Sequence, residues 1–471
     1  MITLYSLVTY YPLFVLGAAG FIILALGILR AKSLVYASVT FAAFVLSFFL
    51  ILYLPHNVDL ADYFVFNDFT IYFALLFIVS SAFITYPALR NIGNRSEIFY
   101  AMLLFVTVGM VVAAFSYNLI TLFISFEAVS IGTYVLAGYH KTKRTLESAT
   151  KYFFTGTVAT TFIILGLSYF FLSTGTFDIL SPEHISSSPD MLIALGLLII
   201  GFGFKLAIFP MHQWAIDTYD GTENSVSAFL STGSKLVAFM IMLKVFIVGF
   251  SGMSGYVYGF FAILAVATMT YANISALSQT NLKKLLAYSS VAQAGYLILV
   301  FAVAGYTSGG SASNYAVAAG MLYSLVYIFM KGGAFLTMNS IKIISPKIDD
   351  LSGMSKKSPG IALSFSVLLL ALAGIPLTGG FFAKFYLFLS LVQGGLWWLA
   401  VVAILNSAIS VFYYFRLMII MYTGSPDDNK FQTPASVKIP VYFSAVIVVA
   451  IFFYFSIFLS LLPMAAGLFG G

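Results

Sequence analysis

Residues 191–210 read MLIALGLLIIGFGFKLAIFP, an apolar run interrupted by a single lysine, Lys205, five positions before Pro210. A run of about 20 apolar residues is long enough to cross the hydrocarbon core of a bilayer as an α-helix. The rest of the chain is similar, because 61% of its 471 residues are hydrophobic and 8% are charged, whereas soluble domains are about 45–50% apolar. The composition therefore predicts an integral membrane protein.

Cutting the chain at its charged and turn-rich segments leaves about fourteen such blocks. The ten-residue alternation of a membrane β-barrel is not seen, so we predict an all-α polytopic protein. The first block lacks a basic segment before it and is too long for a signal peptide, so we expect it to remain in the mature protein. The predicted spans are residues 7–29, 33–54, 70–89, 97–115, 117–138, 148–173, 191–210, 225–249, 256–277, 284–304, 314–340, 359–376 with a second half to 393, 397–421 and 438–464.

The loops between these spans alternate between a set with basic residues and a set without. Because cytoplasmic loops accumulate Lys and Arg, the pattern predicts that both termini lie on the extracytoplasmic side. The net charge of +6 follows from this bias, and no soluble basic domain is present to bind a nucleic acid. The basic loop residues are Arg30, Lys32, Arg90, Arg95, Lys141, Lys143, Arg144, Lys283, Lys284, Lys342, Lys347, Lys356, Lys357, Lys430 and Lys438.

The chain has no cysteine, and its four histidines are scattered over different loops. It therefore has no thiolate set for an iron–sulfur cluster and no Cys/His cluster for zinc. A phosphate-binding GxxxxGK[ST] loop is also missing. We expect no cofactor, no metal and no catalytic residue in this chain.

A few ionisable residues stand inside the apolar spans. A charge at the bilayer centre costs about 2.5–3.5 kcal/mol, so such residues are usually paired or functional. Lys244 and Arg416 are expected to snorkel to an interface, and Lys151 with Glu147 could form a helix-end pair. The candidate functional residues are Glu127, Lys151, Lys205, Lys235, Lys331 and Lys384.

Two prolines stand close to these lysines. Pro210 and Pro376 remove backbone hydrogen bonds in or beside apolar spans, and such breaks survive in lipid only where protein or water satisfies the freed groups. Lys205 precedes the first by five residues, and Lys384 follows the second by eight. Corresponding breaks in two halves of a chain are typical of transporters built from inverted repeats.

Five segments in this order resemble the subunit N family of respiratory complex I and the related F(420)H(2) dehydrogenase, within the larger antiporter-like family. They are KYFFTGT, GFGFKLAIFPMHQWAIDTYDGTENSVSAFLSTGSK, ALSQTNLKKLLAYSSVAQAGY, GIPLTGGFFAKF and LNSAISVFYYFRLMIIMY, and the resemblance covers roughly residues 65–425.

The resemblance implies two inverted five-helix repeats, at residues 97–249 and 256–421, each with a broken helix. They would be preceded by about three helices in residues 1–96 and followed by one in residues 438–471. It implies that Glu127 and Lys205 form the first proton site, that Lys235 connects the two halves and that Lys384 is the terminal site. Lys151 matches an extra family lysine.

Lys331 departs from this pattern. The family's N subunits are expected to carry a neutral residue there, whereas the L-type and cation-antiporter relatives have a lysine in a similar context. Lys331 therefore adds a possible protonation site.

The resulting hypothesis is a proton-translocating subunit of a complex I-like pump in a prokaryotic cell membrane. NADH or an equivalent donor would be oxidised by quinone, with flavin, iron–sulfur clusters and quinone held by partner subunits. Burial disfavours a lysine ammonium and a nearby carboxylate favours it, so movement of the partner would switch the lysine between holding and releasing a proton. The alternatives are a subunit of a Na+/H+ antiporter or of a membrane-bound hydrogenase-type complex, and a passive assembly scaffold.

Overall fold

The computed structural model describes residues 9–54, 58–60, 64–89, 92–93, 95–180, 187–307, 310–343, 345–425 and 431–469. Arg90 and Lys430, two of the basic loop residues used to predict the topology, lie outside the described residues. By contacts between its elements the chain divides into two compact units. Unit 1 comprises Met1–Lys205, Gly233–Met253 and Pro463–Gly471, and unit 2 comprises Leu206–Thr232 and Ser254–Leu462.

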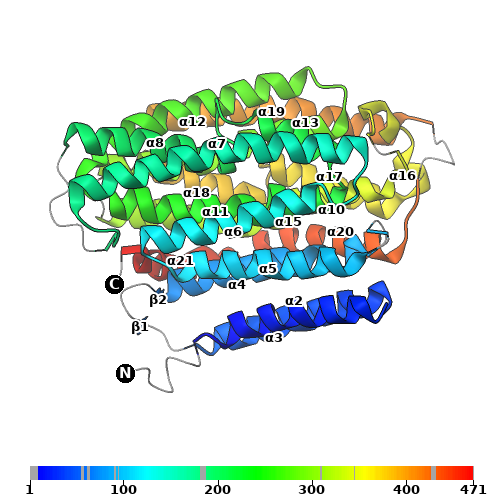
Figure 1. The fold of residues 1–471 in the computed structure, drawn as a ribbon. Helices are drawn as coiled ribbons and strands as arrows, with labels where there is room; N and C mark the ends of the chain where they lie inside the picture. The colour runs from blue at the N-terminus through cyan, green and yellow to red at the C-terminus, as the bar shows by residue number, and fades with distance from the viewer. Residues whose placement is uncertain are drawn as a thin grey trace. The chain divides into compact units, whose positions relative to one another are not determined.

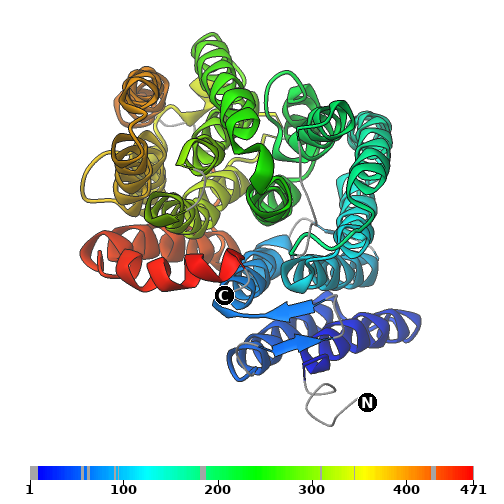
Figure 2. The same cartoon turned by 90° about the vertical axis from the view of Figure 1, so that its left-hand side faces the viewer.

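Unit 1 is a helical bundle in which α5 is the central element and packs on α2, α4, α6 and α11. In Figure 1 α5 and α6 run side by side, and Figure 2 looks almost along their axes. A short antiparallel pair, β1 (Val58–Leu60) and β2 (Phe64–Phe66), precedes α4. The helices are α2 (Tyr11–Ile28), α3 (Ser33–Leu52), α4 (Asp68–Ala88), α5 (Ser96–Phe115), α6 (Leu119–Ala137), α7 (Lys143–Thr174), α8 (Pro189–Leu206), α11 (Gly233–Met242) with its π-helical continuation (Leu243–Gly249), and the 3-10 turns Ser251–Met253 and Gly467–Phe469.

Unit 2 is organised around α15, which is almost wholly buried and packs on α10, α14, α17, α18 and α20. Its helices are α9 (Gln213–Gly221), α10 (Asn224–Ser231), α12 (Ser254–Leu277), α13 (Leu282–Leu297), α14 (Leu299–Thr307), α15 (Gly310–Thr337), α16 (Met354–Lys357), α17 (Pro359–Ala373), α18 (Gly379–Gln393), α19 (Trp397–Thr423), α20 (Ala435–Phe453), α21 (Ile457–Ala466), which runs on into unit 1, and the 3-10 turns Met338–Ser340 and Ile348–Leu351.

The predicted all-α membrane fold is confirmed. Among the described residues, thirteen helical segments are long and apolar enough to cross a membrane. The remaining predicted span, the twelfth in chain order, is divided between α17 and α18, on either side of Pro376. Helices rather than strands form because in lipid only a helix satisfies its backbone hydrogen bonds within one segment.

The first proline break is a helix end rather than a kink. The helix α8 ends at Leu206, before Pro210, and α9 begins at Gln213. A second interruption separates α10, which ends at Ser231, from α11, which begins at Gly233. No proline stands at this interruption. Both interruptions fall beside a candidate lysine, Lys205 or Lys235.

The helices that position the first candidate site have clear start signals. The side chain of Asn118 accepts hydrogen bonds from the amides of Ile120 and Thr121 and so caps α6. Thr142 and Thr145 form a capping box at the start of α7. On α8, Gly201 lies so close to α7 that a Cβ there would meet Ile163 Cγ1 at 2.3 Å. Gly201 therefore allows close packing of α8 on α7.

Candidate functional site

Lys205 is buried in unit 1 and is held by hydroxyl groups. Its Nζ donates hydrogen bonds to Ser130 Oγ (3.4 Å) and Thr133 Oγ1 (3.0 Å) on α6, and to Tyr152 Oη (2.5 Å) on α7. It also lies 5.6 Å from the ring centre of Tyr134. A hydroxyl can accept from an ammonium and can equally donate to a neutral amine. This shell therefore suits both protonation states of the lysine.

Glu127 is the residue that the family resemblance pairs with Lys205. Its carboxylate accepts a hydrogen bond from Thr160 Oγ1 (2.8 Å) and interacts electrostatically with Lys205. Glu127 and Ser130 are three residues apart on α6 and so lie on one face. The carboxylate is thus anchored on α7 while its charge acts on the lysine.

Lys235 and Lys151 have different surroundings. Lys235, in the first turn of α11, is fully buried. Tyr152 interacts with Ser234, the residue before Lys235, as well as with Lys205. The Lys151 side chain is 49% exposed and forms a salt bridge of 2.9 Å with Glu147 one turn earlier. Tyr152 therefore belongs to the buried cluster around Lys205, whereas its neighbour Lys151 lies on the outer face of α7.

Lys244 does not snorkel, so that expectation is wrong. It is fully buried, and its Nζ donates to the backbone carbonyls of Ala113, Ala114 and Ser116 at 2.5–3.2 Å, at the end of α5. Carbonyl oxygens accept but cannot donate. Lys244 therefore acts as a C-terminal cap for α5, in contrast to the hydroxyl shell of Lys205. Arg416 is exposed, as expected.

In unit 2, Lys384 occupies the broken helix. The chain leaves α17 through Gly374, whose φ of 81° closes the helix end. Lys384 Nζ donates to the freed carbonyls of Leu372 (2.9 Å) and Ala373 (3.2 Å) and to Ser407 Oγ (3.0 Å). The carbonyl groups that the break exposes thus accept hydrogen bonds from the candidate lysine.

Lys331 lies in the same buried region of unit 2. On α15 its Nζ donates to the carbonyl of Leu286 and to Ser289 Oγ (2.8 Å). Ser289 is hydrogen-bonded to Tyr414, whose hydroxyl accepts from Gln293 Nε2 (3.4 Å).

Gln293 links this group to the broken helix. Its Nε2 donates to the carbonyl of Leu372 (3.0 Å), which also accepts from Lys384. Its Oε1 accepts from the hydroxyl of Tyr323. The side chain is fully buried. A continuous chain of hydrogen bonds therefore joins Lys331 to Lys384.

Sequence reasoning missed most of the polar partners. Serine, threonine and tyrosine are frequent throughout these apolar helices, so single residues carry no signal. Only the spacing of Glu127 and Ser130 on one helical face could have indicated a partner of Lys205. Tyr152 and Gln293 become recognisable only when the packing is known.

The sequence predicts no metal site, and apart from cysteine the side chains that could form one are acidic residues and histidines. Among the described residues, no group of three or more such side chains is arranged to hold a metal ion. The chain also contains no cysteine.

Residues 116–410 match the family described as "NADH:quinone oxidoreductase/Mrp antiporter, TM". The chain is 40% identical to the F(420)H(2) dehydrogenase subunit N of Methanosarcina mazei, over 81% of this chain and 78% of that protein. It is 35% identical to the NADH-quinone oxidoreductase subunit N of Trichlorobacter lovleyi, over 82% and 80% of the two chains. A chain of the respiratory complex I from Thermus thermophilus with bound aureothin superposes with a TM-score of 0.83 at 27% identity, covering 96% of this chain and 99% of that one.

Proposed function

Since the chain belongs to the NADH:quinone oxidoreductase/Mrp antiporter family of transmembrane proteins, we propose that it is the N-type, proton-translocating membrane subunit of a redox-driven complex. The complex oxidises NADH or an equivalent donor with quinone. We place the iron–sulfur clusters in partner subunits, because this chain has no cysteine to bind a cluster. We expect flavin and quinone in partner subunits as well.

The observation that carries the proposal is the hydroxyl shell of the buried Lys205. A lysine enclosed by Ser130, Thr133 and Tyr152 keeps hydrogen-bond partners whether its amine is charged or neutral. The nearby Glu127 carboxylate interacts electrostatically with Lys205 and favours its charged form. Movement of the carboxylate would therefore load or release a proton at Lys205.

The remaining candidates extend the path. Lys235 follows Lys205 as the connecting lysine, and Lys151 is an additional basic group at the surface of α7. Lys331 and Lys384 form the second proton site. Gln293 Nε2 is the donor in its hydrogen bonds to Leu372 and to Tyr414. An amide nitrogen that only donates does not accept the transferred proton, so Gln293 does not itself carry it. It holds Tyr414 in place by one bond and is itself anchored to the end of α17 by its bond to the Leu372 carbonyl.

The architecture we propose for this function retains the two repeats at residues 97–249 and 256–421. The helices of residues 1–96 and 438–471 flank them, with Pro210 and Pro376 at the two breaks. Both termini face the extracytoplasmic side of a prokaryotic cell membrane.

The test is proton pumping and electron transfer in reconstituted complexes that carry Lys205→Ala or Lys205→Arg. Alanine removes the protonation site, and arginine keeps a charge that does not deprotonate. Both variants should lose proton transport while the subunit stoichiometry stays normal. Normal pumping in a fully assembled Lys205→Arg complex would refute the switch and leave Lys205 as a structural counter-charge. Normal pumping in the alanine variant would favour a passive scaffold.

A second candidate function is a subunit of a Na+/H+ antiporter or of a membrane-bound hydrogenase-type complex, which would use the same buried lysines. The similarity to N subunits at 35–40% identity favours the redox-driven pump. Purifying the intact complex and identifying its other subunits distinguishes the two, because only the redox-driven complex contains flavin- and quinone-binding partners.

A further inference from the structure

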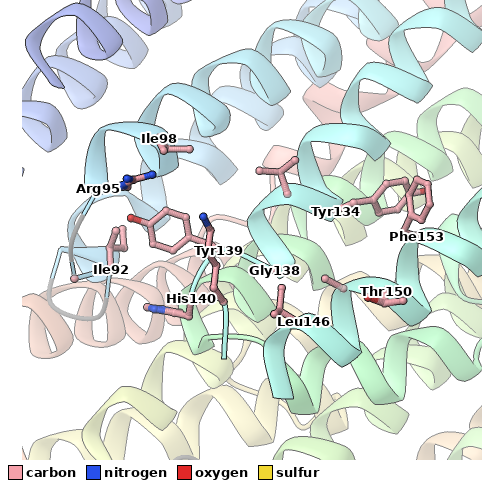
Figure 3. A pocket seen from close by; sticks show the side chains of 14 residues that line it. Ile92, Arg95, Ile98, Tyr134, Gly138, Tyr139, His140, Leu146, Thr150 and Phe153 are labelled. Carbon is pink, nitrogen blue, oxygen red and sulfur yellow. The ribbon is translucent and has the colours of Figure 1, made fainter. Parts of the chain in front are cut away.

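Unit 1 contains an open pocket of about 1000 Å³ where α5, α6 and α7 meet the loops at one end of the bundle. Figure 3 shows Arg95, Tyr139 and His140 grouped at one end of the pocket, and Tyr134 and Phe153 at the other. Neither the proposed proton sites nor the family resemblance assigns a role to this pocket.

The loop end of the pocket is basic. Arg95, Lys141 and His140 line it, and both Arg95 (φ 64°) and Lys141 (φ 51°) have left-handed backbones. Within the part of the chain that the structure describes, no salt bridge joins Arg95 or Lys141 to a carboxylate. Glu97, the nearest acidic residue on α5, has its side chain against Gly27 of α2. The pocket therefore presents the cationic side chains of Arg95 and Lys141 without a salt bridge to a described carboxylate.

Tyr139 adds a hydroxyl group to this end. It lies after the end of α6, where burial and the Glu97 carboxylate raise the pKa of its hydroxyl. The group thus stays protonated and is able to donate a hydrogen bond to an anion.

The other end of the pocket is apolar and continues along the helices. Val135, Leu146 and Phe153 line it and are 45–46% exposed. One turn before Val135 on α6, Ile131 is 59% exposed, and Phe154 on α7 is 63% exposed. A ligand that fits this pocket therefore has an anionic head and an apolar tail.

We propose that this pocket binds an anionic phospholipid, with its phosphate at Arg95, Lys141 and Tyr139 and an acyl chain along the exposed face of α6 and α7. Basic pockets between transmembrane helices are suited to lipid headgroups of this kind. A free phosphate would use only the basic end and would not occupy the apolar wall. The lipid accounts for both ends.

The bound lipid would contact the first proton site through Tyr134. This residue lines the pocket, and its ring packs edge-on against Tyr152 with centroids 4.5 Å apart. Tyr152 is hydrogen-bonded to Lys205. Occupancy of the pocket therefore fixes the two tyrosines that enclose the lysine. This step rests on the proposed function, whereas lipid binding itself does not.

The test is a titration of the purified, delipidated full chain with phosphatidylglycerol, phosphatidylcholine or inorganic phosphate, followed by native mass spectrometry. The variants are Arg95→Asn and Lys141→Asn, because asparagine tolerates a positive φ. The matched control is Lys143→Asn, an exposed lysine at the first residue of α7 that does not line the pocket. Circular dichroism checks that each variant is folded.

Phosphatidylglycerol should bind more tightly than phosphatidylcholine, and phosphate should not compete at equal concentration. Each pocket variant should weaken phosphatidylglycerol binding about fivefold, and the double variant about 25-fold. The Lys143→Asn control should bind as the wild type does. Equal binding of the two lipids, or an unchanged double variant, would overturn the proposal. Competition by phosphate alone would indicate a small-anion site instead, and a neighbouring subunit cross-linked to residue 141 in the intact complex would identify a protein occupant. None of these outcomes changes the expectation for Lys205.

Discussion

The link between Lys331 and Lys384 leads to a prediction that separates stability from transport. Gln293→Leu keeps a side chain of similar size but removes the amide that joins Tyr414, Leu372 and Tyr323. The Leu372 carbonyl still accepts from Lys384, and Tyr414 still bonds to Ser289. The Tyr323 hydroxyl, fully buried, loses the partner recorded for it among the described residues.

The expected magnitude follows from that one orphaned hydroxyl. Leaving a buried polar group without a partner costs about 1–3 kcal/mol, so Gln293→Leu should lower the free energy of unfolding by that amount. The double variant Gln293→Leu/Tyr323→Phe removes both partners and should regain most of the loss. The two changes should therefore show a coupling energy of about 1–3 kcal/mol in a double-mutant cycle.

Proton transport should not recover in the double variant. The barrier between Lys331 and Lys384 rises by about the value of one buried hydrogen bond, which slows transfer about 5- to 150-fold. The assay measures protons pumped per electron in reconstituted complexes, beside thermal unfolding of the purified chain. Tyr323→Phe alone, which keeps the amide, serves as the control and should pump normally. A stable double variant with normal pumping would show that proton transfer between Lys331 and Lys384 does not depend on Gln293.

Three further predictions concern individual positions. Gly374→Ala should destabilise the chain by at least about 1–2 kcal/mol, because φ at this residue is 81°. It should also impair pumping, because the new Cβ would lie 2.7 Å from Lys384 Cδ. A stable, fully active variant would contradict both expectations. Lys244→Met should lower unfolding stability by about 1.5–3 kcal/mol through lost charged hydrogen bonds, while assembled complexes pump as the wild type does; a pumping defect at normal stability would give Lys244 a transport role. In intact cells an impermeant thiol reagent should label Leu180→Cys but not Lys143→Cys, and labelling at position 143 would invert the proposed topology.

Several features of this protein follow from the sequence by itself. The membrane spans agree with the helices to within a few residues at most of their ends, because lipid leaves an apolar chain no alternative to a hydrogen-bonded helix. The burial of Lys205, Lys235, Lys331 and Lys384 agrees with their position within apolar runs, although the same kind of position led to the wrong expectation for Lys244.

Tertiary structure decided what surrounds each lysine. Lys244 and Lys205 both stand in apolar runs, yet one is capped by carbonyls from α5 and the other is enclosed by hydroxyls from α6 and α7. Tyr152 reaches Lys205 across 53 residues of sequence, and Gln293 reaches Leu372 across 79. Hydropathy is a property of one segment, whereas these contacts depend on which helices pack together and how each is rotated about its axis. A helix that is apolar on every side does not encode that rotation in its own pattern, so the partners of the buried charges are set by side-chain packing between helices.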